Sequence, residues 1–169
     1  FIVLNKNKII SSIIIVLIAI ISFYIFDKYK INKKKKISDD FNLATIEHSE
    51  NLNDKTINKL IAIIKQKDPT YSPLSLYFII DNKLISDQDQ INGFFEVLIK
   101  QTPLENEIKN LVIYKKALYN ADQFSEGDLL DALNSLINSE SVWKSHALYL
   151  IAEYFYAKEQ NQKAKEFFN

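Results

Sequence analysis

The feature that most constrains this chain is an uncharged apolar run near its N-terminus. The run covers Ile9–Phe26 and holds 18 residues, nine of them Ile, with no ionisable side chain other than Tyr24. As an α-helix it would be roughly 27 Å long at about 1.5 Å per residue, close to the ~30 Å hydrocarbon thickness of a bilayer. A buried core helix is the alternative, but such a helix usually carries a polar face, and this run has none. The run therefore predicts a transmembrane helix.

Charge divides the rest of the chain into two parts. Residues 1–36 contain eight Lys and one Asp, a balance of +7, whereas residues 37–169 contain thirteen Lys against twenty Asp and Glu, a balance of −7. An acidic domain repels nucleic acid, so we expect no nucleic-acid partner. The basic run Lys33–Lys36 either meets anionic headgroups or belongs to a solvated linker. Membrane lipid is the expected partner of residues 9–36.

These boundaries predict four segments. They are an N-terminal flank, a transmembrane helix, a Lys-rich juxtamembrane linker and a domain large enough for its own core, over 1–8, 9–26, 27–36 and 37–169. Because the chain starts with Phe1 and stops at Asn169 inside an apparent helix, we expect a fragment at both ends. No Ala-x-Ala-like site follows the apolar run, which favours a retained anchor over a cleaved signal peptide. The chain has no Cys, which excludes disulfides and thiolate catalysis.

Apolar residues recur at helical spacing throughout the domain, and strand-like alternation is nearly absent. The pattern predicts eight helices joined by short connections, over 37–50, 54–67, 72–85, 88–101, 103–121, 126–138, 142–159 and 162–169. The clearest start signal is Thr102-Pro103-Leu104-Glu105, a capping box with Pro at the first helical position. Further caps are predicted at Ser72-Pro73, at Asp87 with Gln90, at Ser125 with Asp128, and at Ser141. Short connections require neighbouring helices to be antiparallel.

The spacing of the predicted helices indicates a repeat. Alternate helices start near 37, 72, 103 and 142, which fits helix pairs with a period of about 34 residues. A single pair cannot cover its own apolar face, whereas stacked pairs form one continuous core. A plain up-and-down helix bundle is the alternative.

The last two helix pairs resemble the tetratricopeptide motif. Six residues match its W-x2-L-G-x2-Y and A-x3-F positions: Leu148, Ile151, Ala152, Phe155, Ala164 and Phe168. The preceding pair supplies Ala132 and Leu136 for the A-x3-L part. The resemblance implies an all-α fold in which the transmembrane helix is followed by a tetratricopeptide-like antiparallel helix-hairpin solenoid.

A longer segment is similar to one family in particular. Ala132–Leu136, followed by Trp143 and Ala147–Ala152, resembles the C-terminal half of the ancillary Sec-translocon subunit family, single-span membrane proteins with tetratricopeptide-like repeats. The resemblance covers residues 105–169. It implies a bacterial inner-membrane protein with a periplasmic domain that binds translocon subunits and exported clients in a chaperone-like role.

The lysines that flank the anchor favour the opposite orientation. Two precede the apolar run and six follow it within residues 27–36, and the positive-inside tendency then places the domain in the cytoplasm. A cytoplasm-facing, membrane-tethered adaptor therefore remains an alternative to the extracytoplasmic scaffold. A structural subunit that self-associates through the exposed end of its solenoid is a third.

The residues that usually carry chemistry are sparse. The two imidazoles, His48 and His146, lie far apart in sequence without acidic neighbours at metal-ligand spacing, and we interpret His48 as a solvated helix residue. Asp87-Gln88-Asp89 has the beginning of a calcium loop but lacks the required Gly, so it is interpreted as a helix cap. The two Gly residues form no phosphate-binding loop. We expect no catalytic site, metal or cofactor, and hence no enzyme.

What remains is a candidate partner-binding surface on the predicted helix 142–159. His146, Tyr149, Glu153 and Tyr156 follow one another at spacings of 3, 4 and 3, which places them on one helix face. In tetratricopeptide arrays, which the last repeat resembles, that face lines the concave groove. Packing of the Tyr rings against a neighbouring helix is the alternative. Trp143 is predicted as a core wedge between the last two helix pairs.

Overall fold

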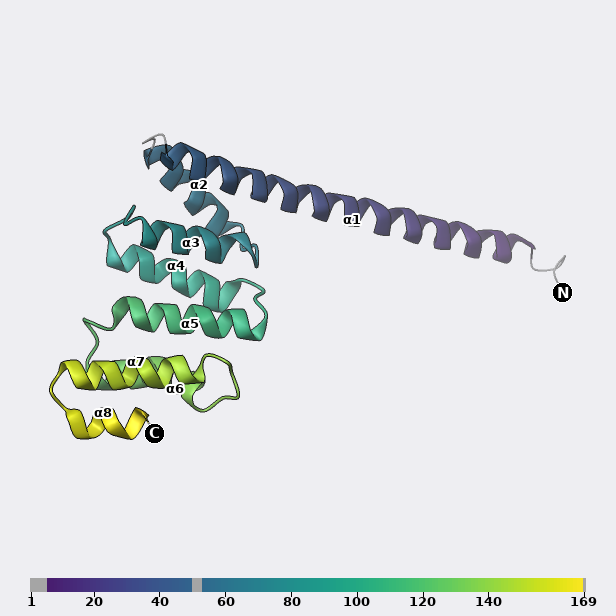
Figure 1. The fold of residues 1–169 in the computed structure, drawn as a ribbon. Coiled ribbons are helices and arrows are strands. Elements are labelled where there is room, and N and C mark those ends of the chain that lie inside the picture. The colour runs from purple at the N-terminus through teal and green to yellow at the C-terminus, as the bar shows by residue number, and fades with distance from the viewer. Residues whose placement is uncertain (1–5, 50–52, 169) are drawn as a thin grey trace.

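The computed structural model describes residues 6–49 and 53–168, and all regular structure in these ranges is α-helical (Figure 1). The helices are α1 (Lys6–Ser49), α2 (Asn53–Lys65), α3 (Tyr71–Asp81), α4 (Gln88–Gln101), α5 (Asn106–Asn120), α6 (Glu126–Ile137), α7 (Lys144–Ala157) and α8 (Asn161–Phe168). The prediction of an all-helical chain with a long apolar N-terminal helix is confirmed. Positions 1–5 of the predicted flank and the predicted helix ends at 50 and 169 lie outside the described residues.

One unbroken helix, α1, joins the apolar run to the other helices. The sequence predicts a linker over 27–36 and a new helix from 37, but the backbone stays helical through both. The separate helix start near 37 is therefore wrong. Neither Gly nor Pro lies between 27 and 49, and Lys is a good helix former, so nothing in this stretch ends the helix.

Burial changes abruptly along α1. All side chains from Ser11 to Lys36 are exposed, and the first buried one is Ile37, at 2% exposure. The apolar run is thus not a core helix of this protein, and α1 is long and apolar enough to cross a bilayer. The N-terminal part of α1 extends away from the other helices, and the part from Ile37 onward packs on α2 and α3 (Figure 1). Between the two parts, Lys30, Lys33 and Lys34 border clefts beside the turn between α2 and α3.

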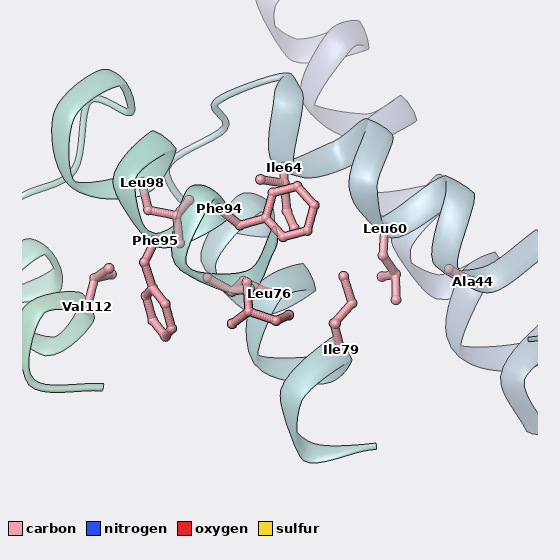
Figure 2. Close-up of a cluster of buried hydrophobic side chains, with 10 residues drawn as sticks. Ala44, Leu60, Ile64, Leu76, Ile79, Phe94, Phe95, Leu98 and Val112 are labelled. Carbon is pink, nitrogen blue, oxygen red and sulfur yellow. The ribbon is translucent and has the colours of Figure 1, made fainter. Parts of the chain in front are cut away.

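The remaining helices form a stack in which consecutive helices run in opposite directions (Figure 1). Each helix packs on its neighbours in sequence, and next-but-one contacts join α1 to α3, α2 to α4, and α5 to α7. The stack contains two buried apolar clusters. The first lies between α1 and α5 (Figure 2) and consists of Ala44, Leu60, Ile64, Leu76, Ile79, Ile91, Phe94, Phe95, Leu98 and Val112. The second lies between α5 and α8 and consists of Ala117, Leu129, Leu133, Leu136, Ala147, Leu150, Ile151, Tyr154, Phe155 and Ala164.

A polar network joins α4 to α5, the helix that both clusters share. Asn120 is only 3% exposed, and its Oδ1 accepts hydrogen bonds from Gln88 Nε2 and Asn92 Nδ2, each at 2.9 Å. Its Nδ2 donates to Asn92 Oδ1 and to the Lys116 carbonyl, each at 2.8 Å. Both ends of the buried amide therefore have partners, which avoids the cost of an unpaired polar group.

Two predicted caps are confirmed. Ser125 and Asp128 form a reciprocal capping box at the start of α6, and the hydrogen bonds from Ser125 lower the pKa of Asp128. Asp87 caps α4, with its Oδ1 accepting from the Gln90 backbone N–H at 3.0 Å. The Asp87-Gln88-Asp89 sequence is therefore a helix start, as interpreted.

Two other predicted caps are wrong. The Thr102 hydroxyl donates back to the Val97 carbonyl at the end of α4 (3.2 Å), and α5 begins only after Glu105. The buried Ser72 hydroxyl donates to the Ile63 carbonyl (2.9 Å), while Asp68 accepts from the backbone N–H groups of the turn before α3. Both hydroxyls bond to the preceding helix: Ser72 already lies inside α3, as its second residue, and Thr102 directly follows the last residue of α4.

Helix continuity from the apolar run into the stack can be measured directly, because the chain has no native Cys. Spin labels at Lys28→Cys and Asn42→Cys should be about 21 Å apart along the axis, at about 1.5 Å per residue, with a narrow distance distribution. Double electron–electron resonance on the full chain in detergent micelles measures this distance. The same pair in a Lys33→Pro background should give a broader distribution, because Pro kinks or breaks a helix. A broad distribution in the otherwise unaltered chain would contradict the continuous helix.

Candidate functional site

The Ser141 hydroxyl, just before α7, both accepts and donates a hydrogen bond. Ser141 Oγ accepts from the Trp143 backbone N–H (3.2 Å) and donates to Glu107 Oε2 on α5 (2.8 Å). The predicted cap at Ser141 is thus two residues early, since the helix itself begins at Lys144. The buried face of α7 includes Leu150, Ile151 and Phe155, so the opposite face is left for solvent or a partner.

The four predicted surface residues lie on that opposite face, and all are exposed. The structure does not gather them into a single pocket. The His146 ring lies 5.1 Å from Trp143 and 5.9 Å from Tyr114, at the start of the helix. A hydrogen bond to Glu153 and the charge of that carboxylate raise the pKa of Tyr149, so these two side chains form a pair at the middle. Tyr156, 67% exposed, lies near α8.

Two aromatic expectations need correction. Trp143 is half-buried and stacks on Tyr114, with centroids 5.9 Å apart and planes at 21°, so it links α5 to α7 outside either buried cluster. It is therefore not a core wedge. His48 is not a fully solvated residue, because its half-buried ring lies edge-on to Phe78 at 5.3 Å. Here α3 packs against the C-terminal part of α1.

The structure shows a larger feature that the sequence analysis missed: three neighbouring clefts across α3, α5 and α7, each of which shares a lining residue with the next. The first, about 470 Å³, is lined by the apolar Leu74, Tyr77, Ile108 and Leu111 and also by the charged Lys34 of α1 and Glu105. The second, about 140 Å³, shares Tyr77 and continues to Lys115 and Leu118. The third, about 490 Å³, shares Leu118 and continues to Asp122, Leu150, Glu153 and Tyr154. We call these three clefts together the inner groove.

Helix periodicity explains the inner groove. On α5, five of its lining residues follow at spacings of 3, 4, 3 and 4, namely Ile108, Leu111, Lys115, Leu118 and Asp122 just beyond the helix end. Leu74, Tyr77 and Asp81 do the same on α3. These stripes have the same spacing as the surface predicted on α7, so a search for matching stripes on alternate helices could have found the groove.

Tyr77 occupies the junction of the first two clefts. The Lys115 ammonium lies over its ring, 5.5 Å from the centroid. The hydroxyl is buried and has no hydrogen-bond partner among the described residues, and burial raises the pKa of Tyr77. The groove wall therefore includes a phenol that is held in its neutral form.

Within residues 6–49 and 53–168, no cluster of His, Asp or Glu has the arrangement of a metal site. No protein-family model, curated protein or solved structure matches this chain. The function must therefore be argued from the geometry of the groove and of α1.

The unpaired Tyr77 hydroxyl gives a stability prediction. Tyr77→Phe should raise the free energy of unfolding by about 1 kcal/mol, because it removes a buried polar group without a partner. The folded pKa of Tyr77 lies above the unfolded value of about 10, so the stabilisation from its neutral phenol is present below pH 10 and lost as the pH rises above it. The Phe variant should lose less stability between pH 9 and pH 11 than the unaltered chain.

Urea unfolding of the full chain in detergent, followed by circular dichroism, measures both effects. Tyr156→Phe is the matched control and should change little, because this side chain is 67% exposed. A Tyr77→Phe variant that is less stable by more than about 1 kcal/mol would show that the hydroxyl has a partner.

Proposed function

We propose that this protein is a single-pass membrane scaffold whose helical domain binds other polypeptides through the inner groove. The observation that carries the proposal is the continuous helix α1. Its apolar part is exposed over the described residues 11–26, and its other end packs into the stack that forms the groove. The groove is thereby attached to the anchor without a flexible joint. The role is binding, with no catalytic step and no cofactor.

The stack supports a tetratricopeptide-like solenoid as the form of the domain. The alternate helices α3, α5 and α7 start 35 and 38 residues apart, close to a helix-pair repeat of about 34 residues. Next-but-one contacts between α1 and α3 and between α5 and α7 are among those that stacked pairs require. Residues at spacings of 3 and 4 line the groove on α3, α5 and α7, as repeated helix pairs would produce; on α7 they are Leu150, Glu153 and Ala157.

Within this class, we propose a role ancillary to the Sec translocon, with the domain on the periplasmic side of the bacterial inner membrane. The support is the resemblance of residues 105–169 to the ancillary Sec-translocon subunit family. The clients would be exported polypeptides that emerge close to the bilayer. Ile37, where burial begins, lies about 16 Å along the helix from Phe26, at about 1.5 Å per residue. A groove at that height is close to segments that leave a membrane channel.

Purification tests the translocon role. The full chain, tagged and extracted in mild detergent after chemical cross-linking in cells, should bring translocon subunits with it. An unrelated single-span protein expressed to the same level is the control for non-specific recovery. Recovery of translocon subunits no greater than with that control would overturn the assignment to the translocon.

A cytoplasm-facing adaptor is the second candidate, favoured by the six lysines within residues 27–36. A single Cys at Ser86, an exposed position between α3 and α4, distinguishes the two orientations. Labelling of Ser86→Cys by an impermeant thiol reagent in intact spheroplasts is expected for the periplasmic domain. Asn7→Cys, on the other side of the apolar run, should then be protected. The reverse pattern would establish the cytoplasmic orientation.

A further inference from the structure

The third cleft of the inner groove has the features of a binding site for one kind of side chain. It lies between the C-terminal part of α5 and α7, and its volume of about 490 Å³ is within the range of ligand pockets in proteins. Its lining includes four apolar side chains, Leu118, Ala121, Leu150 and Ala157. Leu118 is 43% exposed, so this apolar surface is accessible from solvent.

Two carboxylates, Asp122 and Glu153, border the same cleft. Among the described residues, neither forms an ion pair. The cation in the cleft lining, Lys158, is directed to Tyr154, where its Nζ contacts the hydroxyl and lies 4.1 Å from the ring centroid. The acidic border therefore remains without a cationic partner from the protein itself.

An apolar surface with an anionic border fits a long cationic side chain. Lysine and arginine place an aliphatic stem on apolar surface while the charged head remains near water or a counter-charge. The position of Lys158 shows that the Tyr154 ring accepts an ammonium group. The partly exposed Leu118 offers apolar area to the residues that flank such a side chain.

We propose that the cleft between α5 and α7 binds an extended polypeptide segment through a lysine or arginine side chain flanked by apolar residues. This inference rests on the scaffold function proposed above and adds the chemistry of the partner. The partner is selected by charge complementarity, since acidic segments and anionic lipid headgroups are repelled by the same carboxylates. Apolar neighbours on the segment distinguish it from a free polyamine, which carries the charge alone.

Fluorescence anisotropy with the full chain in detergent micelles tests the proposal. The probes are three labelled peptides of nine residues in which a central lysine, glutamine or glutamate is flanked by leucines. The lysine peptide should bind about tenfold more tightly than the glutamate peptide, which corresponds to about 1.4 kcal/mol, and the glutamine peptide should be intermediate. The preference for lysine should weaken as the salt concentration rises.

Two charge-matched double variants locate the site. Asp122→Asn with Glu153→Gln should reduce binding of the lysine peptide to the level of the glutamine peptide. Asp131→Asn with Glu140→Gln removes the same charge from exposed positions outside the groove and should leave binding unchanged. Circular dichroism confirms that both variants keep their helices.

The outcomes separate this inference from the scaffold function. Unchanged binding by the cleft variant, or equal losses in both double variants, would overturn the assignment to this cleft. Equal binding of all three peptides would leave the scaffold function supported and remove the preference for a cation. No binding of any peptide would overturn both proposals.

Discussion

The uninterrupted backbone hydrogen bonding of α1 is the constraint on which the rest of the arrangement depends. An apolar segment and a folded domain are usually joined by residues that can turn freely, but here the polar segment between them has neither Gly nor Pro and stays helical. Burial begins at Ile37, so one helix serves both as the exposed apolar segment and as the first layer of the stack. The position of the inner groove relative to that segment follows from this helix alone.

Within the stack, α5 connects two apolar clusters that have no buried residue in common. Its contact with α4 is partly polar. The amides of Asn120 on α5 and Asn92 on α4 are paired. The carboxylate of Glu96 on α4 binds Lys116 on α5 and also Lys100 on its own helix. Hydrogen bonds to these two lysines lower the pKa of Glu96. Directional bonds of this kind fix the register between two helices more narrowly than apolar contact does.

The sequence predicted the helical class, the apolar segment and the connections that follow α2 and each later helix. Helical spacing and side-chain caps such as Ser125 with Asp128 are local signals, so they can be recognised without the fold. Helix ends were less predictable. Three connections use the left-handed conformation at Lys67, Lys83 and Glu159, where Gly is the usual signal. Of the predicted α7 surface, only Glu153 lines the groove. Most of the lining comes from other residues of α7 and from α3 and α5, which become neighbours only once the helices stack.

A continuous helix also fixes the direction in which the groove opens around the helix axis. Each residue of an α-helix turns the chain by about 100° around the axis, so the number of residues between the apolar segment and Ile37 sets that direction relative to the apolar segment. Insertion of one residue there would rotate the groove by about 100° relative to the apolar segment, whereas insertion of seven residues would return it nearly to its original direction. The length of this stretch therefore affects the direction of the groove as directly as the side chains that line it affect its shape.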